Sequence, residues 1–165
     1  MLSEIIKIAE NYNCLCEFQP VFMHHSDAEK KAAKYIPDQM KDSAEYLIRQ
    51  KKSGKPIANS FAYLNKIKNY PMLPKKEVCW ANKFFCVITP NGSVYPCCVM
   101  LSQKNIDNSG LDIGWEKSFR ALPDMANCGG CFIFCYSEYN LILNNPARAF
   151  IRIVANLFKK TWISR

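Results

Sequence analysis

The stretch CWANKFFCVITPNGSVYPCC, residues 79–98, together with CGGCFIFC, residues 128–135, decides the fold, because it holds seven of the nine cysteines of the chain. Strand-forming residues occupy positions 84–88 and 94–95, on either side of Pro-Asn-Gly at 90–92. Since this tripeptide favours a tight turn, the stretch predicts a β-hairpin.

The spacing of four cysteines predicts an inorganic centre. The hairpin carries Cys79 and Cys97 toward the same end. Cys128 and Cys131 form a second pair, and the two-residue gap between them lets both sulfurs face one ion or cluster while the glycine N–H groups approach the sulfurs. We therefore predict that these four thiolates converge.

Length and composition favour a folded chain with reduced cysteines. With 165 residues, 49% of them hydrophobic, the chain suits one domain or two small ones. It shows no apolar run of membrane-span length and no signal-peptide core, so we expect a cytoplasmic protein. Cysteines stay reduced there, which favours metal or cluster binding over disulfides.

The net charge of +8 permits attraction to nucleic acid, anionic lipid or an acidic partner. It identifies none of them. Because no arginine-rich run or RNA-binding aromatic signature accompanies the charge, nucleic acid is not the partner that we expect.

The first part of the chain reads as helix, strand, helix, helix. Helical patterns cover residues 2–12, 28–52 and 61–67, with Pro37 marking a break or a new first turn, and strand formers cover 14–23. One strand cannot build a closed α/β domain. The missing strands must come from another chain or a longer polypeptide.

Local signals predict where these helices begin and end. Ser3 is a possible cap of the first helix, and Asn59 or Ser60 can cap the third. Ser53 and Gly54 end the second helix. A domain boundary is expected at Pro71–Lys76, which breaks regular structure.

Two cysteines and both histidines lie away from the hairpin. We interpret Cys14 and Cys16 as packing side chains, because unliganded cysteine is commonly buried and no partner pair lies nearby. His24 and His25 are interpreted as solvated or capping residues. A ligand or catalytic role remains the alternative for each pair.

Further helices are predicted beyond the hairpin. A short one over residues 113–122 carries Trp115, which we expect to be a core anchor over the cysteine site. Another covers 136–145. Pro146 opens a last helix through Ile163, amphipathic and basic, which either packs on a partner domain or lies peripherally on a membrane.

These residues resemble a known family: the SPASM or twitch region that binds auxiliary clusters in radical S-adenosylmethionine enzymes. The resemblance covers residues 79–135. It rests on the pattern Cys79, Gly92, Cys97, Asn105-Ile106, Trp115-Glu116, Phe119-Arg120 and Cys128-x-x-Cys131. Residues before it are similar to the last strand and helices of that family's partial barrel.

The resemblance implies one auxiliary [4Fe–4S] cluster on Cys79, Cys97, Cys128 and Cys131. Three surplus cysteines are possible substitutes as ligands: Cys86, Cys98 and Cys135. An apolar pocket around the cluster would be made by Phe84, Tyr95, Trp115 and Phe132.

The sequence departs from the family in one decisive respect. It contains no CxxxCxxC motif, which in the family binds the cluster that cleaves S-adenosylmethionine. That cofactor is therefore expected only through a missing N-terminal domain. The expected partners are a radical enzyme core in the same or a separate chain and an electron donor protein, and the chain alone should not be catalytic.

The expected fold class is α+β: the end of a partial α/β barrel, then a small hairpin and helix domain of twitch type, then the basic C-terminal helix. The corresponding domains are residues 1–70, 71–145 and 146–165. Two other functions remain open. One is a structural zinc module with a nucleic-acid-binding surface, and the other is a ferredoxin-like electron carrier.

Overall fold

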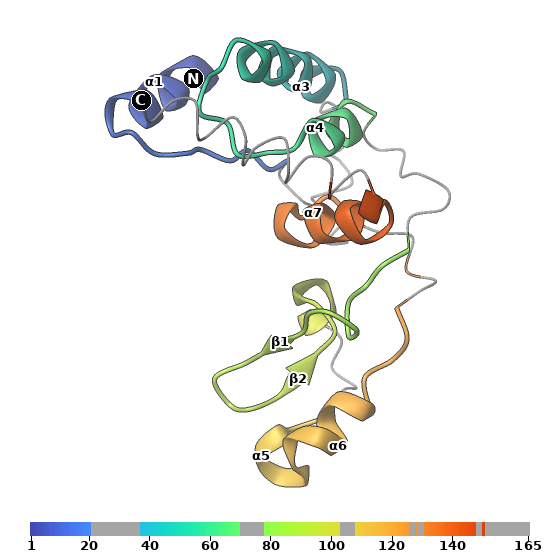
Figure 1. Cartoon of the computed structure of the whole chain (residues 1–165). Coiled ribbons are helices and arrows are strands. Elements are labelled where there is room, and N and C mark those ends of the chain that lie inside the picture. Colours follow the sequence, from blue (N-terminus) through green and yellow to red (C-terminus); the bar gives the residue numbers. More distant parts are fainter. Residues whose placement is uncertain are drawn as a thin grey trace. The chain divides into compact units, whose positions relative to one another are not determined.

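The computed structural model describes residues 1–20, 37–69, 78–102, 108–125, 128, 131–147 and 150 (Figure 1). The chain divides into two compact units. The first unit comprises Met1–Glu77 and Cys131–Arg165, and the second comprises Val78–Gly130.

Four helices build the described part of the first unit: α1 (Leu2–Asn11), α3 (Pro37–Lys52), α4 (Phe61–Lys68) and α7 (Phe134–Leu143). Helix α4 packs against both α3 and α7 (Figure 1). Their shared core consists of buried apolar side chains from α1, α3, α4 and the loop before α4: Ile6, Ala44, Leu47, Ile57, Tyr63, Leu64 and Ile67. Met40 and Ile48 of α3 pack against this core.

Helix ends follow local sequence signals with one exception. Ser60 caps α4, and its hydroxyl accepts a hydrogen bond from Tyr63 N at 3.0 Å. Helix α3 begins at Pro37 and ends before Gly54, which has a φ of +86°. The prediction for Ser3 is wrong, because α1 begins one residue earlier and Met1 occupies the capping position.

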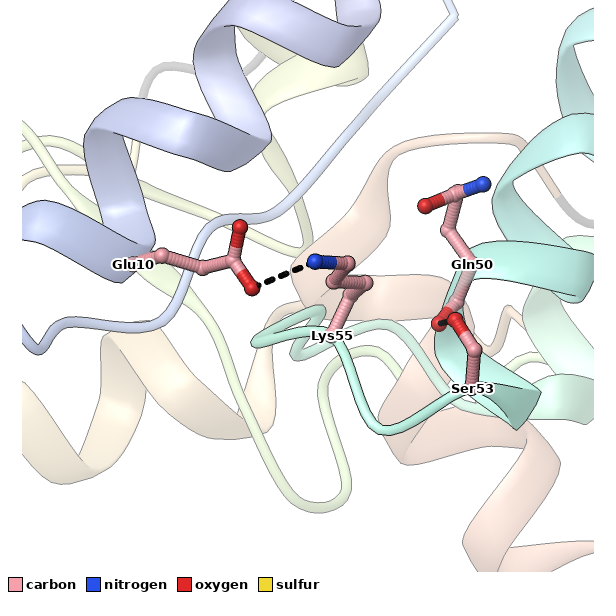
Figure 2. Close-up of polar contacts among 4 residues, drawn as sticks. All are labelled: Glu10, Gln50, Ser53 and Lys55. Atoms are coloured by element: carbon pink, nitrogen blue, oxygen red, sulfur yellow. Dashed lines mark hydrogen bonds and ion pairs between the residues drawn. The ribbon is translucent and has the colours of Figure 1, made fainter.

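Figure 2 shows how the end of α3 is held. The Ser53 hydroxyl donates to the carbonyl oxygen of Gln50 at 2.7 Å. Nearby, the Lys55 ammonium pairs with the Glu10 carboxylate at 2.7 Å, which joins the loop after α3 to α1.

The predicted strand over residues 14–23 is wrong for its described part. Residues 14–20 pair only through an isolated parallel bridge between Cys16 and Ile57. Beyond it, a side chain takes the place of a partner strand: Asn59 accepts from Phe18 N at 2.8 Å and donates to Phe18 O at 2.9 Å. Because these bonds satisfy the backbone of Phe18, the ladder does not continue.

The second unit contains the predicted hairpin. Strands β1 (Val87–Ile88) and β2 (Val94–Tyr95) pair in antiparallel fashion, with Val87 opposite Tyr95 and Ile88 opposite Val94. In the turn, Gly92 has a φ of +83° and donates to Thr89 O at 2.9 Å. Only glycine adopts this backbone conformation without strain.

The first strand is shorter than predicted. Phe84 and Phe85 lie outside β1, because the chain turns at Asn82, which has a φ of +64° and donates to Phe85 O. The side-chain amide of Asn82 also donates to the carbonyls of Leu122 and Pro123. This turn therefore connects the start of the hairpin to the end of the unit.

Three short helices follow the hairpin: a 3₁₀ helix η2 (Cys98–Ser102), α5 (Gly110–Ile113) and α6 (Trp115–Arg120). The short helix predicted over 113–122 is confirmed as α6, which is shorter than predicted because Gly114, with a φ of +87°, separates it from α5. Trp115 is 41% exposed, which contradicts its predicted role as a core anchor. Its ring lies instead directly over Gly110, where even a methyl group would clash with it.

The architecture is α+β, since helices are combined with a two-stranded antiparallel sheet. The similarity of the first unit to a barrel end, the division into 1–70, 71–145 and 146–165, and the basic helix remain predictions. Most of that last helix, like Asn105-Ile106, His24 and His25, lies outside the described residues. Among the helices that the structure describes, none is long and apolar enough to cross a membrane.

Candidate metal centre

Two of the four predicted ligands flank the hairpin in the sequence. Cys79 precedes it, Cys97 follows it, and both are buried. Burial raises the pKa of the Cys97 thiol, and the charges that Cys98 and Cys79 would carry raise this pKa further. In the bare protein the neutral thiol is favoured, whereas a bound cation would favour the thiolate.

The local backbone explains part of this arrangement. Pro96 is fully buried, and η2 begins directly after Cys97. This tight turn directs the N–H groups of Val99 and Met100 toward the Cys97 sulfur, and their hydrogen bonds lower its pKa and so oppose the effect of burial. Amide donors of this kind stabilise ligating thiolates and help to set the potential of iron–sulfur centres.

The second predicted pair is divided between the two units. Cys128 belongs to the second unit, and its N–H donates to Met125 O at 2.9 Å. Cys131 belongs to the first unit. Both residues are half-buried.

Cys131 begins a segment that α4 holds by buried hydrogen bonds. The Ser137 hydroxyl donates to Cys131 O at 2.5 Å, and the Lys66 ammonium donates to that hydroxyl at 3.2 Å. The Tyr63 hydroxyl donates to Phe132 O at 2.7 Å. Two consecutive carbonyls are thus fixed, that of Cys131 by α7 and that of Phe132 by α4.

Burial raises the pKa of Tyr63 above its usual range, and the charges that Glu138, Cys131 and Cys135 would carry raise it further. The phenol therefore stays protonated and remains a hydrogen-bond donor to Phe132 at any physiological pH.

Sequence reasoning missed Tyr63, Lys66 and Ser137. A signal for Lys66 was present, because it lies three residues after Tyr63 and so shares the apolar face of α4. A lysine at such a position is buried only when its ammonium finds partners.

The surplus cysteines have different environments. Cys86 and Cys98 are half-buried in the second unit, and burial raises the pKa of Cys86. Cys135 is exposed on α7. The interpretation of Cys16 as a packing residue is confirmed, since it lies against the first unit's core and donates to Pro56 O at 3.3 Å. Cys14 is exposed, so the burial expected for it is wrong.

The predicted apolar pocket is wrong in two of its members. Phe84 and Trp115 are exposed, because Phe84 lies in the turn before β1 and Trp115 covers Gly110 on the surface. Tyr95 is half-buried and Phe132 is buried.

The structure does not gather the whole ligand set. Within the described residues, no three side chains of His, Cys, Asp or Glu lie together as a candidate metal site. Convergence of Cys79, Cys97, Cys128 and Cys131 therefore remains a prediction. The donor chemistry nevertheless fits the expected group, because two buried thiols, one of them with amide donors, suit a thiolate-bound iron–sulfur centre.

These features define a cysteine-rich module for a metal ion or cluster, built on a small hairpin. Comparison with protein families makes the class specific: residues 79–132 match the model of SPASM, an iron–sulfur cluster-binding domain. The match includes all four predicted ligands and confirms the resemblance inferred from the cysteine pattern. The comparisons found no matching curated protein and no matching solved structure.

Proposed function

We propose that this chain binds one auxiliary [4Fe–4S] cluster through Cys79, Cys97, Cys128 and Cys131. The burial of Cys79 and Cys97 carries the proposal, because both cysteines lie in the region that matches the cluster-binding family. Iron–sulfur clusters of this type are held by four cysteine thiolates, and this set supplies four.

The chain's own residues would shape the centre in three ways. Burial of Cys79 and Cys97 limits the access of water to the sulfurs. The N–H groups of Val99 and Met100 stabilise the Cys97 thiolate. Hydrogen bonds from α4 and α7 hold the backbone at Cys131. A bound cluster supplies one-electron redox chemistry, so the proposed role is electron relay together with support of a neighbouring substrate site.

The proposed setting is a radical S-adenosylmethionine enzyme, of which this chain forms the C-terminal part or a split subunit. The SPASM match supports this setting, and the absence of CxxxCxxC from the sequence assigns generation of the radical to another domain or chain. The proposed partners are that core and an electron donor protein.

Anaerobic reconstitution of the full chain tests cluster binding. We expect about four irons and four sulfides per chain, with the visible absorption of a [4Fe–4S] cluster. One tightly bound zinc without sulfide would overturn the proposal in favour of a structural zinc module.

Matched serine variants assign the ligands. Cys79→Ser, Cys97→Ser, Cys128→Ser and Cys131→Ser should each reduce the iron and sulfide content. Cys14→Ser is the control, because Cys14 is exposed and lies in the first unit. Full cluster content in Cys97→Ser would remove Cys97 from the ligand set and favour Cys86 or Cys98.

A further inference from the structure

The most unusual charge in the first unit is the buried ammonium of Lys66. This residue is only 5% exposed, although lysine is almost never buried without partners. Its Nζ lies 3.2 Å from the Ser137 hydroxyl and 5.5 Å from the centre of the Phe132 ring. The position is therefore a built cation site, with a hydrogen-bond acceptor and an aromatic face.

The contacts of Lys66 lead to a proposed cluster ligand. The Ser137 hydroxyl accepts a hydrogen bond from Lys66 and donates one to the carbonyl oxygen of Cys131 at 2.5 Å. Two successive hydrogen bonds thus link the Lys66 ammonium to the carbonyl oxygen of Cys131. Water screens this charge little, because Lys66 and Ser137 are both buried.

We infer that Lys66 is a positioning residue that holds the Cys131 ligand through Ser137, and that its charge raises the reduction potential of the bound cluster. The inference rests on the proposed function. Its physical basis is direct: reduction adds a negative charge to the cluster, and a nearby buried cation stabilises the more negative state.

The acidic side chain next to Ser137 in sequence has a backbone partner. The Glu138 carboxylate, on the same helix as Ser137, accepts from the N–H of Ser60 at 2.7 Å. On α4 itself, the exposed Lys68 pairs with Glu45 at 2.7 Å. Lys68 therefore provides a matched control, with the same charge and helix but a partner on the surface.

The experiment is a redox titration of the reconstituted full chain, followed by electron paramagnetic resonance. Lys66→Met keeps most of the buried stem and removes the charge, and Lys66→Gln keeps a donor for Ser137 without the charge. In both variants we expect the equilibrium constant for reduction to fall about tenfold, which is about 59 mV toward negative potential for one electron. Lys66→Arg should retain the wild-type potential, and Lys68→Met should not shift it.

The outcomes separate the two proposals. A wild-type chain that assembles a cluster, but whose Lys66→Met and Lys66→Gln variants have the potential of Lys68→Met, overturns the role of Lys66 alone. A wild-type chain that takes up no iron and sulfide overturns the proposed function, and the inference about Lys66 falls with it. A negative shift in Lys66→Gln, with full cluster content, supports the charge effect over a loss of packing.

Discussion

The two units are stabilised by different means. The first buries large side chains from several helices, among them Leu47, Tyr63 and Leu64. In the second, the buried apolar residues that the structure describes are few: Cys79, Ala81, Val94, Pro96, Cys97, Leu122 and Met125. Two of these seven are predicted ligands. From this contrast we predict that the first unit relies on its core, whereas the second depends on the inorganic centre for its stability.

Exposed side chains strengthen the contrast. The second unit leaves Phe84, Leu111, Trp115 and Phe119 exposed. Domains below about 70 to 80 residues rarely gain enough stability from one core and commonly add a metal or disulfides. Metal binding then contributes directly to folding.

The largest expected effect is loss of the second unit when the cluster is removed. In Cys97→Ser, hydrogen exchange at the Val94 amide, which donates to Asn108 O at 2.8 Å, should become fast. The Leu64 amide, which donates to Ser60 O at 3.0 Å, should stay protected, because the first unit keeps its own core. If the Val94 amide is equally protected from exchange with and without the cluster, the proposed difference between the two units is wrong. Cys14→Ser serves as the control.

The second-largest expected effect concerns the core of the first unit. Leu64 is fully buried, so Leu64→Ala should lower the free energy of unfolding by about 2–5 kcal/mol through lost burial and a cavity. Urea denaturation followed by circular dichroism measures the change. Leu111→Ala, at an exposed residue of the second unit, should change the free energy by no more than about 0.5 kcal/mol. Similar losses for both variants would contradict the proposed division.

Two glycines at positive φ, one in each unit, allow a comparison of backbone strain. Gly92→Ala, in the hairpin, introduces a methyl group at positive φ and within 2.5 Å of the Leu111 side chain. We expect a loss of about 1–2 kcal/mol from the backbone strain, plus the displacement of Leu111. Gly54→Ala has the same strain at a φ of +86° in open space. Unfolding curves give the loss of stability for each variant, and the difference between the two losses is the contribution of the clash with Leu111. A smaller loss for Gly92→Ala than for Gly54→Ala would refute this contribution.

The smallest expected effect concerns the ion pair in Figure 2. Lys55→Met removes the pair with Glu10, and because both side chains are about one-third exposed, the loss should be about 0.2–1 kcal/mol. The pair of Lys83 and Asp124 in the second unit is longer, at 3.4 Å, and more exposed. Lys83→Met should therefore cost less. Denaturation at low and high salt measures both, and a loss that salt does not reduce would argue against an electrostatic origin.

Much of the local structure could be predicted from the sequence. The turn at Pro90-Asn91-Gly92, the cap at Ser60 and the end of α3 at Gly54 each depend on a few neighbouring residues with strong conformational preferences. The cysteine spacing predicted the SPASM resemblance for a similar reason, because ligand residues must occur at fixed intervals. The strand over 14–23 failed, because a strand needs a partner and Asn59 occupies that place.

By itself, the sequence determined the hairpin, most helix ends and the set of thiols available for an iron–sulfur centre, since these follow from short-range preferences and from side-chain chemistry. Only the tertiary structure decided that the chain returns at Cys131 to pack on α4, that Tyr63, Lys66 and Ser137 hold this segment, and that Trp115 lies on the surface. The physical reason is that burial and hydrogen bonding between distant segments depend on packing, which no local pattern specifies.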